Sequence, residues 1–388
     1  FRTGAVIGTV IRADSGGIGK YMSTGNKVKK SLIITTVGGF VSRFEMDNVH
    51  IMQKLGYEVH YAANFNNTVY EFDKNELINN GIVLHHVDID KNPYNIASLY
   101  KSYKEILEIA KTENINLIHC HTPVGGVLGR LVGRNTDCKV IYTAHGFHFY
   151  KGAPMKNWMF YYPVEKILAR YTDCLITINE ADYKQSQKMK AKHTVRIPGI
   201  GIDLDRFKPG RKYERTGDIF RVVSVGELNQ NKNHQVVIKA INLLNDKNIQ
   251  YDIYGKGDGK ERLEKMIAEY HMNDQVHLRG YVNDTRSVLY NADCFVFPSI
   301  REGLGMAALE AMACGVPLIA ADNRGTREYA RHGENAYVCE PNDEESFAYY
   351  IKKIKENPET AEELLANALK TVQWFSKEHT DKIMEQVY

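Results

Sequence analysis

Short apolar runs alternate with segments of helical spacing along most of the chain, and this alternation constrains the fold more than any other feature. One series runs from Ser31 to Ile178 and a second from Phe220 to Val338, with a proline-bounded stretch, Pro198 to Pro209, between them. The expected helices include Val41 to Leu55 in the first series, 234–246 and 325–331 in the second, and a last helical stretch at about 359–388. Strands that alternate with helices build parallel sheets covered by helices on both faces. The 388 residues are enough for two hydrophobic cores. The sequence therefore predicts an α/β protein with two Rossmann-like, doubly wound parallel-sheet domains.

The domain limits follow from the same pattern. We place the first domain at residues 31–200 and the second at residues 201–373. The chain before residue 31 lacks the uninterrupted apolar core of a signal peptide, and its Ser15-Gly-Gly-Ile-Gly run has a flexible composition. We therefore expect residues 1–30 to be a leader or an added extension that is disordered, with at most a weak strand at Val6 to Ile11.

Cysteine usage and hydropathy indicate a cytoplasmic protein. The six cysteines form no C-x-x-C pair and mostly lie in apolar runs, as buried reduced thiols do. No run approaches the ~18 apolar residues of a membrane span. We expect a cytoplasmic location, with peripheral attachment to the cytoplasmic face of the membrane as the alternative.

The charge is unevenly distributed along the chain. Residues 1–200 carry 25 Lys and Arg against 17 Asp and Glu, a net charge of +8, whereas the remainder carries 25 against 30, a net charge of −5. A basic half favours an anionic partner such as a membrane surface. Stretch 147–162 is aromatic and basic, with Lys151, Lys156 and Trp158, and fits either a membrane interface or a packed helix with basic tips. No helix-turn-helix or RNA-binding signature accompanies it, so we expect no nucleic-acid partner.

The segment from Ser299 to Pro317 carries the clearest chemical signal. An apolar run is followed by Gly303-Leu304-Gly305 and then by good helix formers. A strand, a glycine loop and a helix in this order present backbone amides to a phosphate, and residues 303–305 are the candidates.

Two glutamates flank this loop at positions 302 and 310. Glu310 lies one turn inside the predicted helix, where its carboxylate can accept two hydrogen bonds from a ribose diol. Glu302 precedes the helix and can reach a second part of the same ligand. Together these groups predict a nucleotide-sugar site, although an ordinary strand-to-helix turn fits the segment when it is taken alone.

Three further places hold candidate residues. Gly226 and Lys232 bound a loop after a predicted strand, where the lysine suits a diphosphate or is an exposed loop residue. His145 ends a strand and either faces a ligand or caps the strand. Gly38 and Gly39 follow the first strand and allow close backbone approach or a simple turn.

Five motifs, which follow one another in the family's order, resemble those of the retaining glycosyltransferases of family 4. The resemblance covers roughly residues 31–388. The Glu302–Glu310 spacing resembles the E-x7-E signature of that family. The other four are Gly38-Gly39-Phe40, Tyr142-Thr-Ala-His145-Gly146, Ile197-Pro-Gly-Ile-Gly-Ile-Asp203 and Ser224-Val-Gly226-Glu227-Leu-Asn-Gln-Asn-Lys232. The resemblance implies the GT-B fold, in which two Rossmann-like domains face a cleft and the end of the chain, here about 374–388, completes the first domain.

The resemblance also implies roles for the candidate residues. His145, Lys232 and Glu302 would be catalytic, with His145 bonded to the donor sugar and Lys232 at the diphosphate. Donor-binding positions would be Gly38, Gly39, Gly226, Tyr281, Gly303, Leu304, Gly305 and Glu310. The family usually has an arginine where this chain has Glu227, so the glutamate would point away or Arg301 or Arg324 would supply the charge.

The predicted function is transfer of a sugar, as a hexosyltransferase, from a nucleoside diphosphate donor to a hydroxyl acceptor. By resemblance the donor is UDP-hexose or UDP-N-acetylhexosamine, and the acceptor is a saccharide or a polyprenyl-diphosphate-linked saccharide in capsule or exopolysaccharide biosynthesis. A nucleotide-sugar epimerase and a silent nucleotide-sugar-binding scaffold remain alternatives. His119 and His121 share a strand face without a carboxylate or cysteine at suitable spacing, so we expect no metal and no cofactor.

Overall fold

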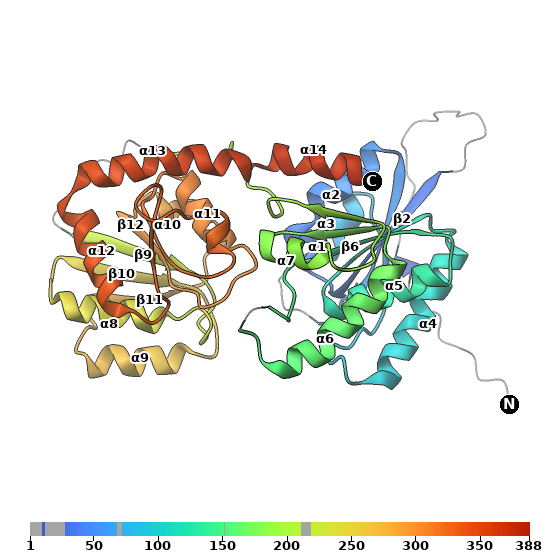
Figure 1. Cartoon of the computed structure of the whole chain (residues 1–388), viewed down its shortest axis with the longest axis horizontal. Helices are drawn as coiled ribbons and strands as arrows, with labels where there is room; N and C mark the ends of the chain where they lie inside the picture. Colours follow the sequence, from blue (N-terminus) through green and yellow to red (C-terminus); the bar gives the residue numbers. More distant parts are fainter. Residues whose placement is uncertain (1–9, 12–27, 68–71, 151, 211–218) are drawn as a thin grey trace. The chain divides into compact units, whose positions relative to one another are not determined.

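A computed structural model of the chain describes residues 10–11, 28–67, 72–150, 152–210 and 219–388 (Figure 1). The chain divides into two compact units. Unit 1 consists of the chain up to Ile200 together with Asp381–Tyr388, and unit 2 consists of Gly201–Thr380. The C-terminal segment that belongs to unit 1 therefore begins at residue 381 rather than at about residue 374.

Unit 1 contains an eight-stranded sheet in the order β1-β4-β3-β2-β5-β6-β7-β8. Every neighbouring pair is parallel except β1 and β4, which are antiparallel. Strands in the middle of the sheet are buried along most of their length, because helices cover both faces of a parallel sheet. The strands are β1 (Val10–Ile11), β2 (Lys29–Val37), β3 (Tyr57–Asn64), β4 (Val83–His86), β5 (Leu117–His121), β6 (Lys139–Ala144), β7 (Cys174–Thr177) and β8 (His193–Arg196).

The start of the chain agrees with the sequence prediction at one place and differs at another. Val10–Ile11 pairs with β4 as an edge strand, within the range where a weak strand was expected. β2 begins at Lys29 instead of Ser31, so the expectation that residues up to 30 are disordered is wrong for Lys29 and Lys30. Residues 1–9 and 12–27 lie outside the described part of the chain.

Four helices of unit 1, α3, α4, α5 and α7, begin at capping side chains. Asp73, Asn95, Thr122 and Asn179 each accept a hydrogen bond from a backbone N–H in the first turn of the helix that follows. The helices are α1 (Phe40–Phe44), α2 (Met46–Lys54), α3 (Lys74–Asn79), α4 (Ile96–Thr112), α5 (Pro123–Arg134), α6 (Met155–Leu168), the 3-10 turn η1 (Ala169–Tyr171) and α7 (Glu180–Ser186).

One predicted helix, Val41 to Leu55, is broken in the structure. Glu45 has φ −128° and ψ 6°, outside the helical region, and separates α1 from α2. The Glu45 side chain is buried, so the break between α1 and α2 places a carboxyl group inside unit 1.

Unit 2 contains a six-stranded, fully parallel sheet in the order β11-β10-β9-β12-β13-β14. The strands are β9 (Phe220–Val225), β10 (Ile249–Tyr254), β11 (Val276–Gly280), β12 (Cys294–Phe297), β13 (Leu318–Ala321) and β14 (Tyr337–Cys339). The helices are α8 (His234–Leu244), α9 (Lys260–Glu269), α10 (Arg286–Leu289), α11 (Met306–Ala313), the 3-10 turn η2 (Thr326–Glu328), α12 (Glu344–Glu356), α13 (Pro358–Trp374) and α14 (Lys377–Val387), of which α14 ends in unit 1.

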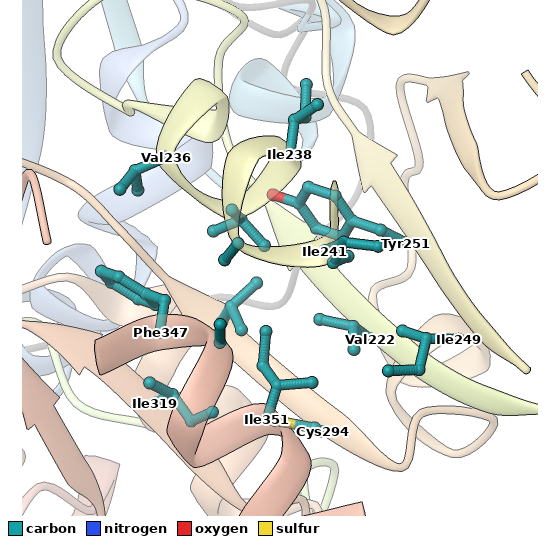
Figure 2. Packing of buried hydrophobic residues seen from close by; sticks show 14 of the residues in the cluster. Val222, Val236, Ile238, Ile241, Ile249, Tyr251, Cys294, Ile319, Phe347 and Ile351 are labelled. Carbon is teal, nitrogen blue, oxygen red and sulfur yellow. The ribbon is translucent and has the colours of Figure 1, made fainter. Parts of the chain in front are cut away.

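The core of unit 2 lies between the sheet and helices α8 and α12, which pack against each other (Figure 2). Ile238 and Ile241 of α8 and Phe347 and Ile351 of α12 are at most 1% exposed. These four side chains lie on the apolar faces of the two helices, at the i, i+3 and i, i+4 spacing of an amphipathic helix.

Two helical predictions in unit 2 are wrong in extent. The predicted helix at 325–331 is only a three-residue 3-10 turn, because the Asn323 side chain bonds the amides of Gly325 and Thr326 and holds a tight turn there. The predicted single helical stretch at 359–388 is interrupted at Phe375, whose carbonyl accepts a hydrogen bond from the amide of Ile202.

The core packing predicts a large stability loss on truncation of Phe347. Phe347→Ala removes a fully buried aromatic ring and should lower the free energy of unfolding by about 3–5 kcal/mol. Tyr349→Ala, on the same helix but 59% exposed, is the matched control and should change it by less than about 1 kcal/mol. Urea denaturation followed by circular dichroism measures both, and equal effects would contradict the assigned core.

Candidate active-site residues

The loop after β9 and the loop after β12 meet at one edge of the unit 2 sheet. Their strands are direct parallel neighbours, with Cys294 opposite Val222, so their carboxyl ends lie at the same edge. Lys232 at the end of the first loop and Glu302 in the second form an ion pair, with Lys232 Nζ 2.6 Å from Glu302 Oε1. The two residues are 70 positions apart in sequence, and the sheet topology brings them together.

Both members of this ion pair are shielded from solvent. The side chains of Lys232 and Glu302 are 22% and 15% exposed. The lysine lies across Gly226, where an added Cβ would be 3.3 Å from Lys232 Cδ, and its Nζ is 5.5 Å from the centroid of the Phe297 ring. Gly226 therefore leaves room for the lysine side chain to extend toward the second loop.

Gly305 begins helix α11 in a left-handed conformation, with φ +94° and ψ +64°. An added Cβ there would lie 2.6 Å from Cε1 of Phe297, so both backbone angle and space require glycine. The Leu304 side chain is 4% exposed, which leaves only its backbone for a ligand contact. Gly303 is partly exposed at the start of the same loop.

Glu310 lies in the second turn of α11 and is held by Thr285. Its Oε2 accepts a hydrogen bond of 2.9 Å from the threonine hydroxyl. The carboxylate is partly exposed, so it is oriented by the protein and still open to solvent. This arrangement is compatible with the acceptor role that the sequence predicts for Glu310.

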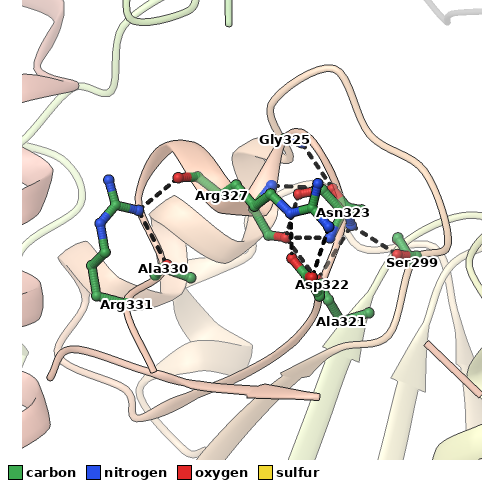
Figure 3. A network of polar contacts seen from close by, with 9 residues as sticks. Ser299, Ala321, Asp322, Asn323, Gly325, Arg327, Ala330 and Arg331 are labelled. Atoms are coloured by element: carbon green, nitrogen blue, oxygen red, sulfur yellow. Dashed lines mark hydrogen bonds and ion pairs between the residues drawn. The ribbon is translucent and has the colours of Figure 1, made fainter. Parts of the chain in front are cut away.

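Asn323 and its neighbours support the Glu302 loop, and the sequence prediction did not include them. The buried Asn323 amide donates to the carbonyl of Ser299 at 2.8 Å and accepts from the amide of Gly325 at 2.9 Å (Figure 3). A Cβ added at Gly325 would be 2.9 Å from Cβ of Glu302. Asn-Arg-Gly-Thr directly after a strand is a turn composition that could have indicated this support.

The exposed Glu227 carboxylate accepts a hydrogen bond of 2.8 Å from the Asn229 side chain. Of the two arginines considered as substitutes, Arg324 donates from Nε to the carbonyl of Glu302 at 3.3 Å, whereas Arg301 is exposed. Lys232 directly contacts a carboxylate of the candidate motif, that of Glu302.

A glycine-rich loop at Gly255-Lys-Gly-Asp-Gly259 packs directly on the Gly226 loop. A Cβ added at Gly255 would lie 1.8 Å from the carbonyl oxygen of Gly226, so the two backbones touch. Lys256 of this loop has Nζ 5.6 Å from the ring centroid of Tyr281, which is 49% exposed. Three closely spaced glycines are a sequence signal for such a contact, although the sequence prediction did not include it.

The candidate residues of unit 1 gather around Phe40. Gly38 and Gly39 connect β2 to α1, and a Cβ at Gly38 would be 2.6 Å from Cδ1 of Phe65. The Phe40 ring that follows stacks edge-on against His145 with centroids 5.3 Å apart. Close packing thus explains Gly38 without a ligand.

His145, which is partly exposed, belongs to a chain of titratable groups that includes the buried His121 and Glu45. Nε2 of His145 lies 3.2 Å from Nδ1 of His121, which in turn is 3.4 Å from Oε1 of Glu45. Burial lowers the pKa of His145 to about 4, and burial together with the neighbouring imidazoles lowers the pKa of His121 well below its usual value. Burial raises the pKa of Glu45 to about 8. Near pH 7 this chain therefore contains uncharged imidazoles and a largely protonated carboxyl.

His119 has different hydrogen-bond partners from His121. Its Nδ1 lies 2.7 Å from the hydroxyl of Tyr388 and its Nε2 lies 2.8 Å from Oγ1 of Thr143. Glu45, His121 and His145 offer ligand atoms within 4.8 Å of one another, so a carboxylate does lie near the histidines, contrary to the spacing argument from the sequence. It comes from the break between α1 and α2, which the sequence pattern did not reveal.

A cavity of about 200 Å³ opens beside His145 in unit 1. Aromatic, hydroxyl and carboxyl side chains line it, among them Tyr142, Thr143, His145, Phe149, Tyr161 and Glu165. Oε2 of Glu165 accepts a hydrogen bond of 2.6 Å from Nη1 of Arg130, and Arg130 is fully buried. Aromatic faces beside hydrogen-bonding groups are suited to a saccharide.

Two parallel-sheet, Rossmann-like units with a glycine loop and an E-x7-E helix at a strand edge define a GT-B protein. Two family models match: Glycosyl transferase 4-like over residues 32–179 and Glycosyl transferases group 1 over residues 207–371. The chain is 38% identical over 376 residues to the putative glycosyltransferase EpsD of Bacillus subtilis, covering 93% of this chain and 96% of that protein. The chain belongs to the group 1 and 4-like glycosyltransferases.

Two further proteins are similar to this chain. A UDP-Gal:alpha-D-GlcNAc-diphosphoundecaprenol alpha-1,3-galactosyltransferase of Escherichia coli is 26% identical over 291 residues, 70% of this chain and 72% of that protein. The structure of Anabaena HepE in complex with UDP and glucose superposes with a TM-score of 0.76 at 17% identity, covering 93% of this chain and 99% of that chain. The second likeness shows the GT-B fold.

The buried carboxyl predicts a pH-dependent effect of Glu45→Gln. Because the folded pKa of Glu45 is raised to about 8, its contribution to stability is full below about pH 4.5 and is lost as pH rises toward 8. Glutamine does not ionise, so the variant should gain stability relative to wild type between pH 5 and 8, by at most about 1.4 kcal/mol per pH unit.

Urea denaturation at pH 5, 6, 7 and 8 measures this difference. Glu108→Gln, which changes an exposed carboxylate on α4, is the control and should give a constant difference. A constant difference for Glu45→Gln as well would contradict the raised pKa of the Glu45 carboxyl.

Proposed function

We propose that this glycosyltransferase is a retaining hexosyltransferase of surface polysaccharide biosynthesis. It transfers a hexose or N-acetylhexosamine from a UDP-sugar to a hydroxyl group of a saccharide carried on polyprenyl diphosphate. The observation that carries the proposal is the shielded Lys232–Glu302 ion pair beside the glycine start of α11.

The donor site in this proposal is built from the two loops of unit 2. Lys232 binds the diphosphate, which replaces Glu302 as the partner of the lysine and releases that carboxylate for the hydroxyl groups of the sugar. The N-terminus of α11, with glycine at position 305, contributes its positive end to the same diphosphate. Glu310, oriented by Thr285, accepts hydrogen bonds from the ribose.

The proposed transfer keeps the configuration of the anomeric carbon. The bond between this carbon and the diphosphate oxygen breaks, and the acceptor oxygen bonds to the same face of the carbon. The acceptor proton moves to the departing phosphate. Lys232 stabilises the negative charge that develops on the leaving group, and binding in a fixed orientation supplies the rest of the rate enhancement.

Unit 1 supplies His145 and the cavity beside it. We propose that the uncharged imidazole bonds a hydroxyl of the donor sugar and that the aromatic cavity receives the acceptor saccharide. The Escherichia coli relative is named for a sugar linked to diphosphoundecaprenol, which supports a lipid-linked acceptor. Anabaena HepE forms a complex with UDP, which supports UDP as the nucleotide.

The proposed reaction uses no metal, because Lys232 and the start of α11 supply the positive charge that a cation would otherwise bring to the diphosphate. We propose a cytoplasmic enzyme that reaches its acceptor as a peripheral protein of the cytoplasmic membrane face.

A transfer assay tests the function. Radiolabelled UDP-glucose, UDP-galactose and UDP-N-acetylglucosamine are each incubated with polyprenyl-diphosphate-linked N-acetylhexosamine, with and without EDTA. We expect label in the lipid fraction with one of these donors, an α-linked product by NMR and the same rate in EDTA. Conversion of the UDP-sugar without acceptor would indicate an epimerase, and tight binding without turnover would indicate a scaffold.

Replacement of Lys232 by alanine tests its part in the reaction. Because negative charge builds on the diphosphate as the glycosidic bond breaks, Lys232→Ala should lower kcat by about 10²–10³ and UDP affinity much less. Lys239→Ala on α8, an exposed lysine paired with Glu344, is the matched control and should keep normal turnover. Normal kcat with a raised KM for Lys232→Ala would show that the lysine only binds the donor.

A further inference from the structure

Helix α6 presents a mixed apolar and basic stripe to solvent. Its exposed positions all fall within about one third of the helix circumference at 100° per residue. They are Met155, Lys156, Met159, Pro163, Lys166 and Ile167. Met155, Met159 and Ile167 are 73%, 74% and 53% exposed, and none of the six is acidic.

The start of α4 continues this surface. Tyr94, Ile96 and Tyr100 are 66%, 70% and 57% exposed. The Tyr94 ring lies 5.0 Å from the ring of Phe160 on α6, which joins the two segments into one surface, called the α4–α6 face below. Of eight exposed large apolar side chains in the described part of unit 1, six belong to this face.

The charge of the α4–α6 face is mostly positive. From residue 91 to residue 104 and along α6, five lysines are exposed and no carboxylate is. They are Lys91, Lys101, Lys104, Lys156 and Lys166. Asp90, just before the first stretch, is partly exposed and accepts hydrogen bonds from the Asn92 amide and the Asn95 side chain. Glu105, just after it, pairs with Lys101 at 3.8 Å, and Glu108 one turn further along α4 is exposed.

Trp158, which the sequence offered as a membrane contact, lies on the inner side of α6. Its indole N–H donates to the carbonyl of Tyr150 at 3.2 Å, and its ring is 5.5 Å from that of Phe149. The aromatic part of stretch 147–162 is therefore packed, and Lys151 is outside the described residues. The opposite side of the same helix carries the exposed stripe.

We propose that the α4–α6 face docks on an anionic lipid bilayer. Exposed methionine, isoleucine and tyrosine side chains enter the interfacial region while the lysines pair with lipid phosphates, which is how amphipathic surfaces bind membranes. The excess of lysines favours an anionic bilayer, since every exposed charge of α6 and of residues 91–104 is positive. In the part of the chain that the structure describes, no helix is long and apolar enough to cross a membrane.

The inner side of α6 connects the proposed docking face to the proposed acceptor cavity. Tyr161 and Glu165 of α6 line the cavity beside His145. One helix thus carries the lipid-binding face on one side and part of the proposed acceptor cavity on the other. This connection rests on the proposed function, because it assigns the cavity to a lipid-linked saccharide.

Vesicle co-sedimentation with the full chain tests the docking face. Vesicles contain phosphatidylcholine with 0, 20 or 40% phosphatidylglycerol, at 50 and 500 mM NaCl. We expect the bound fraction to rise with phosphatidylglycerol and to fall at high salt, because salt screens the lysines. Met155→Ser/Met159→Ser/Ile167→Ser and, separately, Lys156→Glu/Lys166→Glu should each lower the partition coefficient at least tenfold.

The control replaces exposed apolar residues elsewhere. Leu55→Ser/Leu243→Ser, at positions 42% and 55% exposed, should bind vesicles like wild type. Circular dichroism and UDP affinity, which depends on unit 2 in our account, show whether each variant is folded. Folded α6 variants that bind like wild type, equal binding to neutral vesicles, or no wild-type binding at 50 mM NaCl would each overturn the docking proposal. Vesicle binding without sugar transfer would instead refute the proposed function and leave the docking face supported.

Discussion

The direct pairing of β9 with β12 is the constraint on which the candidate donor site depends. These strands are neighbours in the sheet although about 70 residues separate them, and their parallel direction brings both following loops to one edge. The Lys232–Glu302 ion pair forms across that junction. Gly255 and Gly305 are needed because a backbone and a ring approach there more closely than a Cβ allows, and a Cβ at Gly226 would press on the Lys232 side chain.

The shielded ion pair has a consequence for how a donor binds. In the proposed function, a diphosphate takes the place of Glu302 as the partner of Lys232. The Asn323 turn bonds the backbone of the Glu302 loop, so in this proposal the loop stays in place while the Glu302 side chain exchanges partners. The proposed exchange couples diphosphate binding to release of the Glu302 carboxylate, and it gives no part to Glu227, which is exposed and bonded to Asn229.

The periodic features of the fold could be predicted from the sequence, and the contacts between distant segments could not. Apolar runs and helix formers indicated the strands of unit 2, the strands of unit 1 other than β8 and the glycine start of α11, because such signals are local. The break at Glu45, the pairing of Lys232 with Glu302 and the inward orientation of Trp158 depend on packing partners far away in the sequence. Composition alone fitted stretch 147–162 equally well to a packed core helix and to a membrane interface. In the structure, α6 has one packed side and one exposed side.

The most direct test of this account is a crystal structure of the chain with UDP bound. We expect Lys232 Nζ within ion-pairing distance of a β-phosphate oxygen, the Glu302 carboxylate moved away from the lysine, and the ribose hydroxyls bonded to Glu310. UDP bound with its diphosphate away from the loops that follow β9 and β12, or an intact Lys232–Glu302 pair beside the bound nucleotide, would contradict the account.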